Sequence, residues 1–271
     1  MVRHQAGAPR QTWQDMKNKV ILAVGAHPDD MEFGASGTVA KWIDAGATGY
    51  YLICTDGSRG ASDPKMTHDR LARIRKQEQI DACKILGVKK AFFLNHTDTQ
   101  LVADIILKEE IVRIIRTLRP NIVITMDPTF YYSSNFFNGS GFVNHTDHRA
   151  ASIATMDACF PLSRDRLTFL EHEKEGLKPY KVEELLFVSL DRVASNATGT
   201  FDSAARRGFE KKDFLVDITK TFSKKIKALS LHKSQFDNFK EIEERVTKRA
   251  RMFGKSKGCK FAENFIHIRL P

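Results

Sequence analysis

The sequence contains 271 residues, of which 42% are hydrophobic and 28% are charged, with a formal net charge of +10 at pH 7. This composition is typical of a globular protein with a full apolar core, and it argues against a chain that is disordered throughout. The sequence has neither an apolar run approaching the ~20 residues that span a bilayer nor the apolar stretch of a secretory signal, so we expect a soluble, cytoplasmic protein.

Up to about residue 160, short apolar runs alternate with longer amphipathic ones. Strands are expected at 19–26, 50–55, 91–94 and 122–126, with helices between them at 34–45, 67–86 and 104–118. Strands that alternate with helices favour a parallel sheet covered by helices on both faces. We therefore predict an α/β protein with a Rossmann-like, open, mostly parallel sheet.

The pattern changes after the fourth expected strand. Residues 128–147 are rich in Tyr, Phe, Asn, Ser and Gly and predict a long loop. Its aromatic part, 130–142, is either functional, for example as a lid, or ordinary packing. Further on, residues 184–190 and 214–218 resemble strands, and 219–252 is mostly helical in pattern. Because neither a repeat nor a low-complexity linker divides the chain, we expect one domain over 1–271. Residues 1–160 would form its Rossmann-like core and 161–271 would complete it.

The positive charge is concentrated near the C-terminus. Residues 203–260 hold 17 Lys and Arg against 7 Asp and Glu, so the rest of the chain is neutral overall. Acidic residues such as Glu241, Glu243 and Glu244 interrupt this basic block, as on a solvated helical face. A nucleic-acid or anion-binding surface is the alternative, although no known nucleic-acid motif accompanies the charge.

Two clusters of imidazoles and carboxylates follow expected strands. HPDD (27–30) comes directly after the first strand, and HTDH (145–148) follows the fourth strand and the long loop. Ligand sites of open α/β sheets lie beyond the carboxyl ends of the strands. His27, Asp30 and a His of the second cluster would give three N/O ligands, which describes a catalytic zinc site with a position left for water. Two His and one carboxylate also suit Fe(II), so a non-haem Fe(II) oxygenase is an alternative.

Each residue of these clusters also has a simpler interpretation. Asp29 and Asp30 can serve as helix caps, and a lone loop His is commonly a surface residue. Glu32 lies early in the following helix, where an acid suits the macrodipole, or it hydrogen-bonds the metal loop. The presence of two clusters, each at the expected end of a strand, favours the metal site.

Four sequence blocks resemble those of the LmbE/PIG-L superfamily, whose members are zinc-dependent deacetylases of N-acetylglucosaminyl compounds. The blocks are AHPDDMEFGASGTVA (26–40), CTDGSRG (54–60), RKQEQIDACKILGV (75–88) and NHTDHRAA (144–151). FLNHTDTQL (93–101), LHKSQF (231–236) and AENF (262–265) are similar too. The resemblance thus covers nearly the whole chain in order.

The resemblance implies roles for eight residues. It implies His27, Asp30 and His148 as zinc ligands and Asp29 as the general base. It also implies His145 as a cation that stabilises the oxyanion and Asp147 as the carboxylate that orients His145. Arg59 and Arg75 match blocks that line the sugar-binding side in relatives, which is a looser assignment.

One position departs from the pattern of some relatives. Those relatives carry a Tyr two residues before the His that matches His145, whereas this sequence has Val143 there. Tyr131, Tyr132 or no tyrosine would then supply a hydroxyl, and either Asp29 or His145 would protonate the leaving amine.

We therefore predict a zinc-dependent hydrolase that removes the N-acetyl group from a small N-acetylated sugar or related N-acyl compound, with Fe²⁺ or another divalent ion as alternatives to zinc. The sequence leaves the individual substrate and the oligomeric state open.

Overall fold

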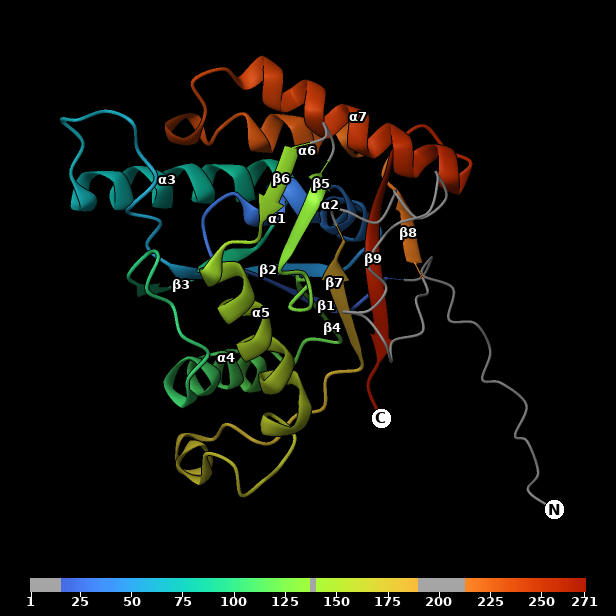
Figure 1. Cartoon of the computed structure of the whole chain (residues 1–271). Helices are drawn as coiled ribbons and strands as arrows, with labels where there is room; N and C mark the ends of the chain where they lie inside the picture. The colour runs from blue at the N-terminus through green and yellow to red at the C-terminus, as the bar shows by residue number, and fades with distance from the viewer. Residues whose placement is uncertain (1–15, 137–139, 190–212) are drawn as a thin grey trace.

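The protein is described by a computed structural model that covers residues 16–136, 140–189 and 213–271 (Figure 1). Its main sheet has seven strands in the order β3-β2-β1-β4-β7-β9-β8. The strands are β1 (Val20–Gly25), β2 (Thr48–Thr55), β3 (Lys90–His96), β4 (Ile122–Met126), β7 (Glu184–Val188), β8 (Asp213–Asp217) and β9 (Ala262–Arg269). β9 pairs antiparallel with both β7 and β8, while the pairs from β3 to β7 are parallel. The predicted α/β class with a mostly parallel sheet is confirmed.

Helices cover both faces of this sheet. They are α1 (Asp30–Gly34), α2 (Ser36–Asp44), α3 (His68–Leu86), α4 (Ile105–Leu118), α5 (Thr146–Asp157), α6 (Phe222–Leu229) and α7 (Phe239–Lys257). In Figure 1, α3, α6 and α7 lie above the sheet and α4 and α5 lie below it. None of the helices within the described ranges is both long and apolar enough to cross a membrane.

Strand β1 shows why the strand sequences are continuously apolar. Ile21 and Ala23 belong to the core on one face, whereas Leu22 and Val24 belong to the core on the other. A strand that is buried on both faces has no polar side to alternate with, which is typical of parallel sheets. The helices have local stop signals as well, since α3 ends at Gly87, a glycine in the left-handed region with φ of 80°.

Three expected elements differ from the structure. The predicted loop at 128–147 contains a hairpin of β5 (Tyr132–Phe136) and β6 (Ser140–Val143), and it already includes the first turn of α5. The helix expected at 34–45 begins earlier, at Asp30, and is interrupted at Ala35. The helical stretch 219–252 is two helices, α6 and α7, separated by a turn that includes the short 3-10 helix Lys233–Gln235. Strand β9 was not predicted, because its buried positions include the polar Glu263 and Asn264.

The break between α1 and α2 is held by a buried ion pair from the C-terminal part of the chain. Lys225 of α6 donates to the carbonyls of Glu32 and Phe33 at the end of α1, at 2.7 and 3.0 Å. Glu263 of β9 accepts from Gly37 and Thr38 at the start of α2, at 3.1 and 2.7 Å. The two charged groups are 2.7 Å apart. A cation at a helix C-terminus and an anion at a helix N-terminus each complement the helix dipole.

Candidate metal centre

Both predicted clusters lie at one edge of the sheet, between β1 and β4. The strand order reverses here, because β1 has β2 on one side and β4 on the other. The loop 26–29 leaves the end of β1, while the hairpin that follows β4 returns the chain to His145, the N-cap of α5. A doubly wound sheet places its ligand site at such a switch point.

Three imidazoles meet at this edge. The ring centroids of His27 and His148 are 5.1 Å apart, those of His27 and His145 are 4.7 Å apart, and those of His145 and His148 are 5.3 Å apart. One nitrogen of each ring lies within 4.8 Å of the others. Segments more than a hundred residues apart in the sequence therefore present their imidazoles to a common point.

Asp30 is the carboxylate nearest to these rings. Its Oδ2 accepts the backbone N–H groups of Ala26 and His27 at 2.8 and 2.9 Å, which leaves Oδ1 directed to Nε2 of His148 at 3.1 Å. Gly25 permits this tight turn, because a Cβ there would lie 3.1 Å from Cβ of Asp30. Burial opposes ionisation of Asp30, but the neighbouring His148 and His27 outweigh it and lower its pKa well below the usual value. An ionised carboxylate facing imidazoles suits a divalent cation.

His27 is held from behind by two further carboxylates. Its Nε2 lies 3.1 Å from Oδ1 of Asp98 and 3.2 Å from Oδ2 of Asp147. Burial disfavours the charged ring, yet the hydrogen bonds to Asp147, Asp30 and Asp98 raise the pKa of His27 well above its usual value. A carboxylate on the far nitrogen of a metal-ligating His fixes the ring and raises its basicity, and the residues around His27 fit that pattern.

Asp98 was missed by the sequence analysis. It lies just beyond β3, is 3% exposed, and accepts the N–H of Arg59 at 2.9 Å as well as the contact from His27. The burial of Asp98 opposes its ionisation, but contact with His27 lowers its pKa to about 2. Its place after the third strand of the sheet is the signal that could have identified it.

The contacts of Asp147 and His145 refine their expected relation. The Asp147 carboxylate accepts from the N–H groups of Thr99 and Leu101 and contacts His27, and it is the backbone N–H of Asp147 that donates to Nδ1 of His145, at 3.2 Å. Nδ1 is therefore an acceptor, so a neutral ring carries its proton on Nε2. Burial and the nearby His27 and His148 lower the pKa of His145. These contacts favour a neutral Nε2–H donor over the cation implied by the resemblance.

Asp29 lies next to the cluster on an unusual backbone. Its φ of 105° is in the left-handed region, and the residue is 9% exposed. Its N–H donates to Oε1 of Gln79 at 3.0 Å, and its Oδ1 lies 3.4 Å from Nη2 of Arg75. Burial raises the pKa of Asp29 to about 6, although the Arg75 charge opposes the rise. Such a carboxylate has the basicity that proton transfer near neutral pH requires.

The two arginines expected on the sugar-binding side lie in different environments. Arg75 is 4% exposed, and its guanidinium donates to the carbonyls of Gly57 and Pro28 at 3.0 and 2.6 Å, so it lies behind Asp29. Arg59 is exposed, with Nη1 3.4 Å from Nε2 of His68. Only Arg59 presents its charged group to solvent beside the site.

The tyrosines considered as hydroxyl donors lie on the hairpin side of the site. Tyr131 is 56% exposed, Tyr132 is 71% exposed, and Val143 is 75% exposed. The Arg149 guanidinium lies over the Tyr131 ring at 5.2 Å, and the Tyr131 carbonyl accepts from the N–H of Asn144. Asn144 in turn contacts Nδ1 of His148, so Tyr131 is two contacts away from an expected ligand.

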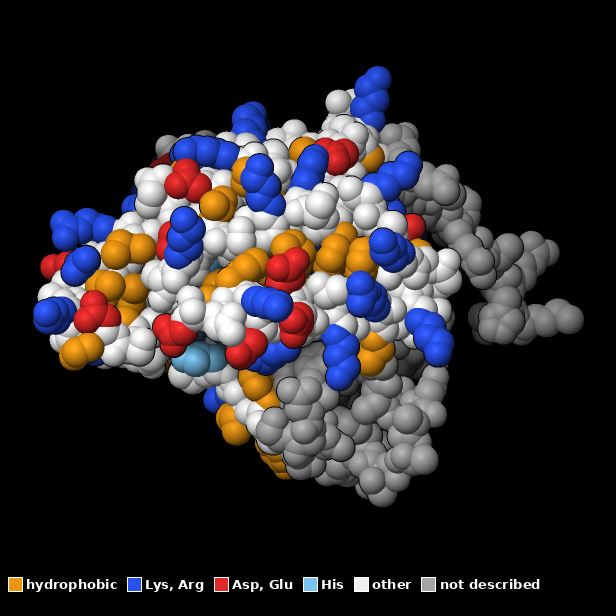
Figure 2. Space-filling model, turned by 90° about the horizontal axis from the view of Figure 1, so that it is seen from above, with side chains coloured by type: hydrophobic (Ala, Val, Ile, Leu, Met, Phe, Trp, Pro, Cys, Tyr) orange, Lys and Arg blue, Asp and Glu red, His pale blue; other side chains and the backbone are white. Residues whose placement is uncertain are grey.

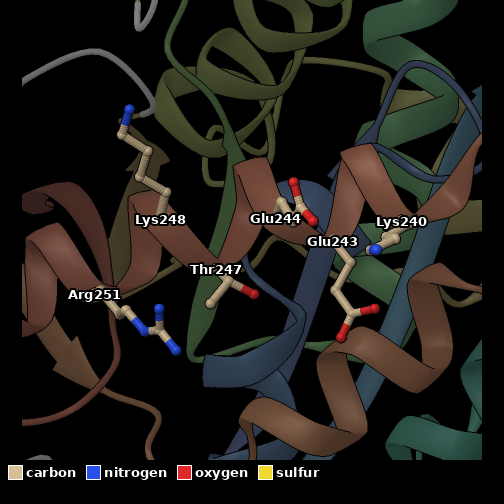
Figure 3. A pocket seen from close by; sticks show the side chains of 6 residues that line it. All are labelled: Lys240, Glu243, Glu244, Thr247, Lys248 and Arg251. Atoms are coloured by element: carbon tan, nitrogen blue, oxygen red, sulfur yellow. The ribbon is translucent and has the colours of Figure 1, made fainter.

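Within 213–260, the described part of the basic block, the Lys and Arg side chains do not form one continuous basic surface. Lys225 is 1% exposed and belongs to the buried ion pair described above. On the face seen in Figure 2, Lys and Arg side chains are scattered among acidic ones. An open hollow along α7 is lined by Lys240, Glu243, Glu244, Thr247, Lys248 and Arg251 (Figure 3), in which both signs of charge alternate.

Comparisons with known proteins agree on one family. The profile of the PIG-L family, described as GlcNAc-PI de-N-acetylase, matches residues 22–159. The chain is 31% identical to diacetylchitobiose deacetylase of Thermococcus kodakarensis, over 92% of this chain and 86% of that protein. It is 28% identical to 1D-myo-inositol 2-acetamido-2-deoxy-α-D-glucopyranoside deacetylase 2 of Saccharopolyspora erythraea, over 79% and 82%. The inhibitor-bound structure of N,N′-diacetylchitobiose deacetylase from Pyrococcus horikoshii superposes with a TM-score of 0.77 and 26% identity, covering 95% of this chain and 86% of that one.

Proposed function

This chain belongs to the PIG-L (LmbE-like) family of deacetylases, and from that premise we propose that it is a zinc-dependent hydrolase of N-acetylglucosaminyl-type sugars. The observation that carries the proposal is the meeting of His27, Asp30 and His148 next to Asp29 and His145. Two relatives are named for N-acetylated sugars, diacetylchitobiose and an inositol glycoside, which supports a small glycoside as substrate.

In the proposed site, His27, Asp30 and His148 would hold the zinc. Bound there, zinc would act as a Lewis acid that polarises the acetamide carbonyl and makes water a better nucleophile. The role of Asp98 and Asp147 is then to orient His27 through its Nε2, at 3.1 and 3.2 Å. That contact leaves Nδ1, 3.8 Å from Oδ2 of Asp30, as the ligating atom.

Asp29 is the proposed base. Its Oδ1 faces Arg75, so Oδ2 accepts the proton of the attacking water. The acetamide nitrogen must leave as an amine, and it accepts that proton from Oδ2 of Asp29 as its bond to the carbonyl carbon breaks. The same carboxyl group thus serves both half-reactions, which its pKa of about 6 suits.

His145 is the proposed oxyanion donor. Because its Nδ1 accepts the N–H of Asp147, its Nε2–H is available to the carbonyl oxygen as negative charge develops there. Arg59, exposed next to Asp98, is the proposed contact to the sugar. Arg75 has its place behind the base instead.

The function can be tested by metal removal. The purified protein is incubated with diacetylchitobiose and other N-acetylglucosaminides, and released acetate is measured by mass spectrometry. We expect acetate release that a chelator abolishes and zinc restores. Activity that is unaffected by the chelator, or no acetate from any compound in the panel, would contradict the proposal.

Measuring oxygen consumption alongside acetate release tests the alternative that the protein is an Fe(II) oxygenase. An oxygenase would consume oxygen after anaerobic reconstitution with Fe²⁺, whereas a hydrolase releases acetate without oxygen. The family match favours hydrolysis, because the relatives are named deacetylases. We therefore retain hydrolysis as the single proposed reaction.

A further inference from the structure

The peptide bond between Pro28 and Asp29 is gripped at both ends by helix α3. Arg75 Nη2 donates to the Pro28 carbonyl at 2.6 Å, and Gln79 Oε1 accepts the Asp29 N–H at 3.0 Å. Arg75 and Gln79 are four residues apart, so they lie one above the other on the same face of the helix. Two side chains of a single helix therefore fix the orientation of one peptide group.

This grip acts on a strained residue. Asp29 has a φ of 105°, a region that residues with a Cβ rarely adopt. Such a conformation persists only where its surroundings hold it, and it is typical of sites in which a side chain must be aimed. The direction of the Asp29 side chain from its Cα depends on this φ, so the peptide grip also aims the carboxylate.

The orientation of the Gln79 amide is itself determined by a neighbour. An amide presents oxygen on one side and NH₂ on the other, and only the oxygen can accept the Asp29 N–H. Gln79 Nε2 donates to Oε1 of Glu32 at 3.1 Å, so the NH₂ side of the amide is the side that faces Glu32. Glu32 thus directs the NH₂ group to itself and the oxygen to Asp29. On the other side of Glu32, Oε2 lies 3.5 Å from Nε2 of His232.

We propose that Gln79 is a positioning residue for Asp29, and that Glu32 holds Gln79 in the orientation this task requires. The proposal rests on the function proposed above, in which Asp29 is the base. Gln79, Glu32 and His232 are all 0% exposed, so these polar groups are enclosed together in the interior. Burying an amide in place of an apolar side chain is unfavourable unless its hydrogen bonds are made, and here both sides of the Gln79 amide are used.

The first experiment replaces Gln79→Met, which keeps the length of the side chain and removes its acceptor. The matched control is Gln77→Met, on an exposed position of the same helix. For the zinc-loaded protein we expect kcat to fall roughly 10- to 100-fold in the Gln79 variant, with KM and zinc content within twofold of the wild type. The control should match the wild type in all three quantities.

Three outcomes would overturn the proposal. If kcat of the zinc-loaded Gln79→Met variant stayed within twofold of the wild type while its melting temperature fell, Gln79 would be structural only. If the variant lost zinc, Gln79 would support the metal ligands rather than the base. Crystal structures of both proteins give a readout that needs no turnover, because the proposal expects Asp29 to leave its positive φ in the variant. An unchanged φ would contradict it even if no substrate were found.

A second pair of variants separates a loss of positioning from a loss of folding, because the second substitution should restore the activity that the first removes. Gln79→Glu alone sets two carboxylates against each other and should lower kcat strongly. The double variant Glu32→Gln with Gln79→Glu exchanges the positions of the amide and the carboxylate. The carboxylate at position 79 can then accept from both the Asp29 N–H and the amide at position 32. We expect the double variant to recover at least tenfold in kcat over Gln79→Glu alone. Absence of recovery in a folded, zinc-loaded double variant would contradict the role of Glu32.

Discussion

The sheet edge near His27 and the outer face of α7 both gather charged side chains, and the two regions differ in how deeply those side chains are buried. At the sheet edge, Asp29, Asp30, Asp98 and Asp147 are 9% exposed or less, and each has specific backbone or side-chain partners. Along the outer face of α7, the side chains of Lys240, Glu243, Glu244, Lys248 and Arg251 are exposed to water. The sheet edge holds fewer charged groups, but each is fixed in position. Because these groups are shielded from water, the electrostatic interactions among them are stronger. Net charge alone would place a binding site on α7, whereas the burial of charged groups indicates a functional site at the sheet edge.

The largest effect should come from removing an expected metal ligand. We expect His148→Ala to lose bound zinc and all measurable deacetylation, because Asp30 and His27 alone leave too few ligands. Zinc content by atomic absorption, together with acetate release, measures this. His96→Ala is the control, since His96 is half-buried and bonds to Glu110 instead. A zinc-loaded, active His148→Ala protein would contradict the ligand set.

Replacing the base should leave the metal in place. We expect Asp29→Asn to reduce kcat by about 10²- to 10⁴-fold, the usual contribution of general acid–base catalysis, with zinc content unchanged. Asp63→Asn, on an exposed loop residue, is the control. If Asp29→Asn retained more than a tenth of the wild-type kcat, another group would have to be the base.

The buried ion pair tests whether fixed charge also matters for folding. We expect Lys225→Met to lower the free energy of unfolding by about 3–5 kcal/mol, because Glu263 is left as an uncompensated buried charge. The neighbouring Lys224 provides a matched control, since its side chain is 40% exposed and pairs with Asp44. Lys224→Met should cost less than about 1 kcal/mol in urea denaturation. Equal effects of the two substitutions would erase the contrast between buried and exposed charge.

The smallest effect is expected on α7. Reversing the charge of Lys240 and Lys248 to Glu should change kcat/KM by less than twofold and stability by about 0.5 kcal/mol or less. The wild type should not bind duplex DNA even at low salt, where phosphate contacts are strongest. Salt-sensitive DNA binding that the reversals abolish would revive a nucleic-acid role for the basic block.

The sequence predicted most of the parallel half of the sheet because its strands are buried on both faces. Four strands and the helices between them follow from apolar runs such as 19–26, and two clusters at strand ends indicated where the site would lie. Strand β9 was not predicted because it buries the polar Glu263. That burial depends on an ion pair with Lys225, which lies far from Glu263 in the sequence. Asp98 and Gln79 were not predicted as site residues for the same reason. Their hydrogen-bond partners, His27 and Asp29, are brought near only by the fold.

The position of β9 also has a consequence for how the protein is made. Among the described residues, β8 pairs with β9 alone, and β9 inserts between β7 and β8, although β8 is synthesised first. During translation, β8 must therefore wait as an unpaired edge, and the N–H groups of Gly37 and Thr38 at the start of α2 lack their acceptor until Glu263 has been added. The strand synthesised after β8 is therefore the one that fastens both an edge strand of the main sheet and the start of α2.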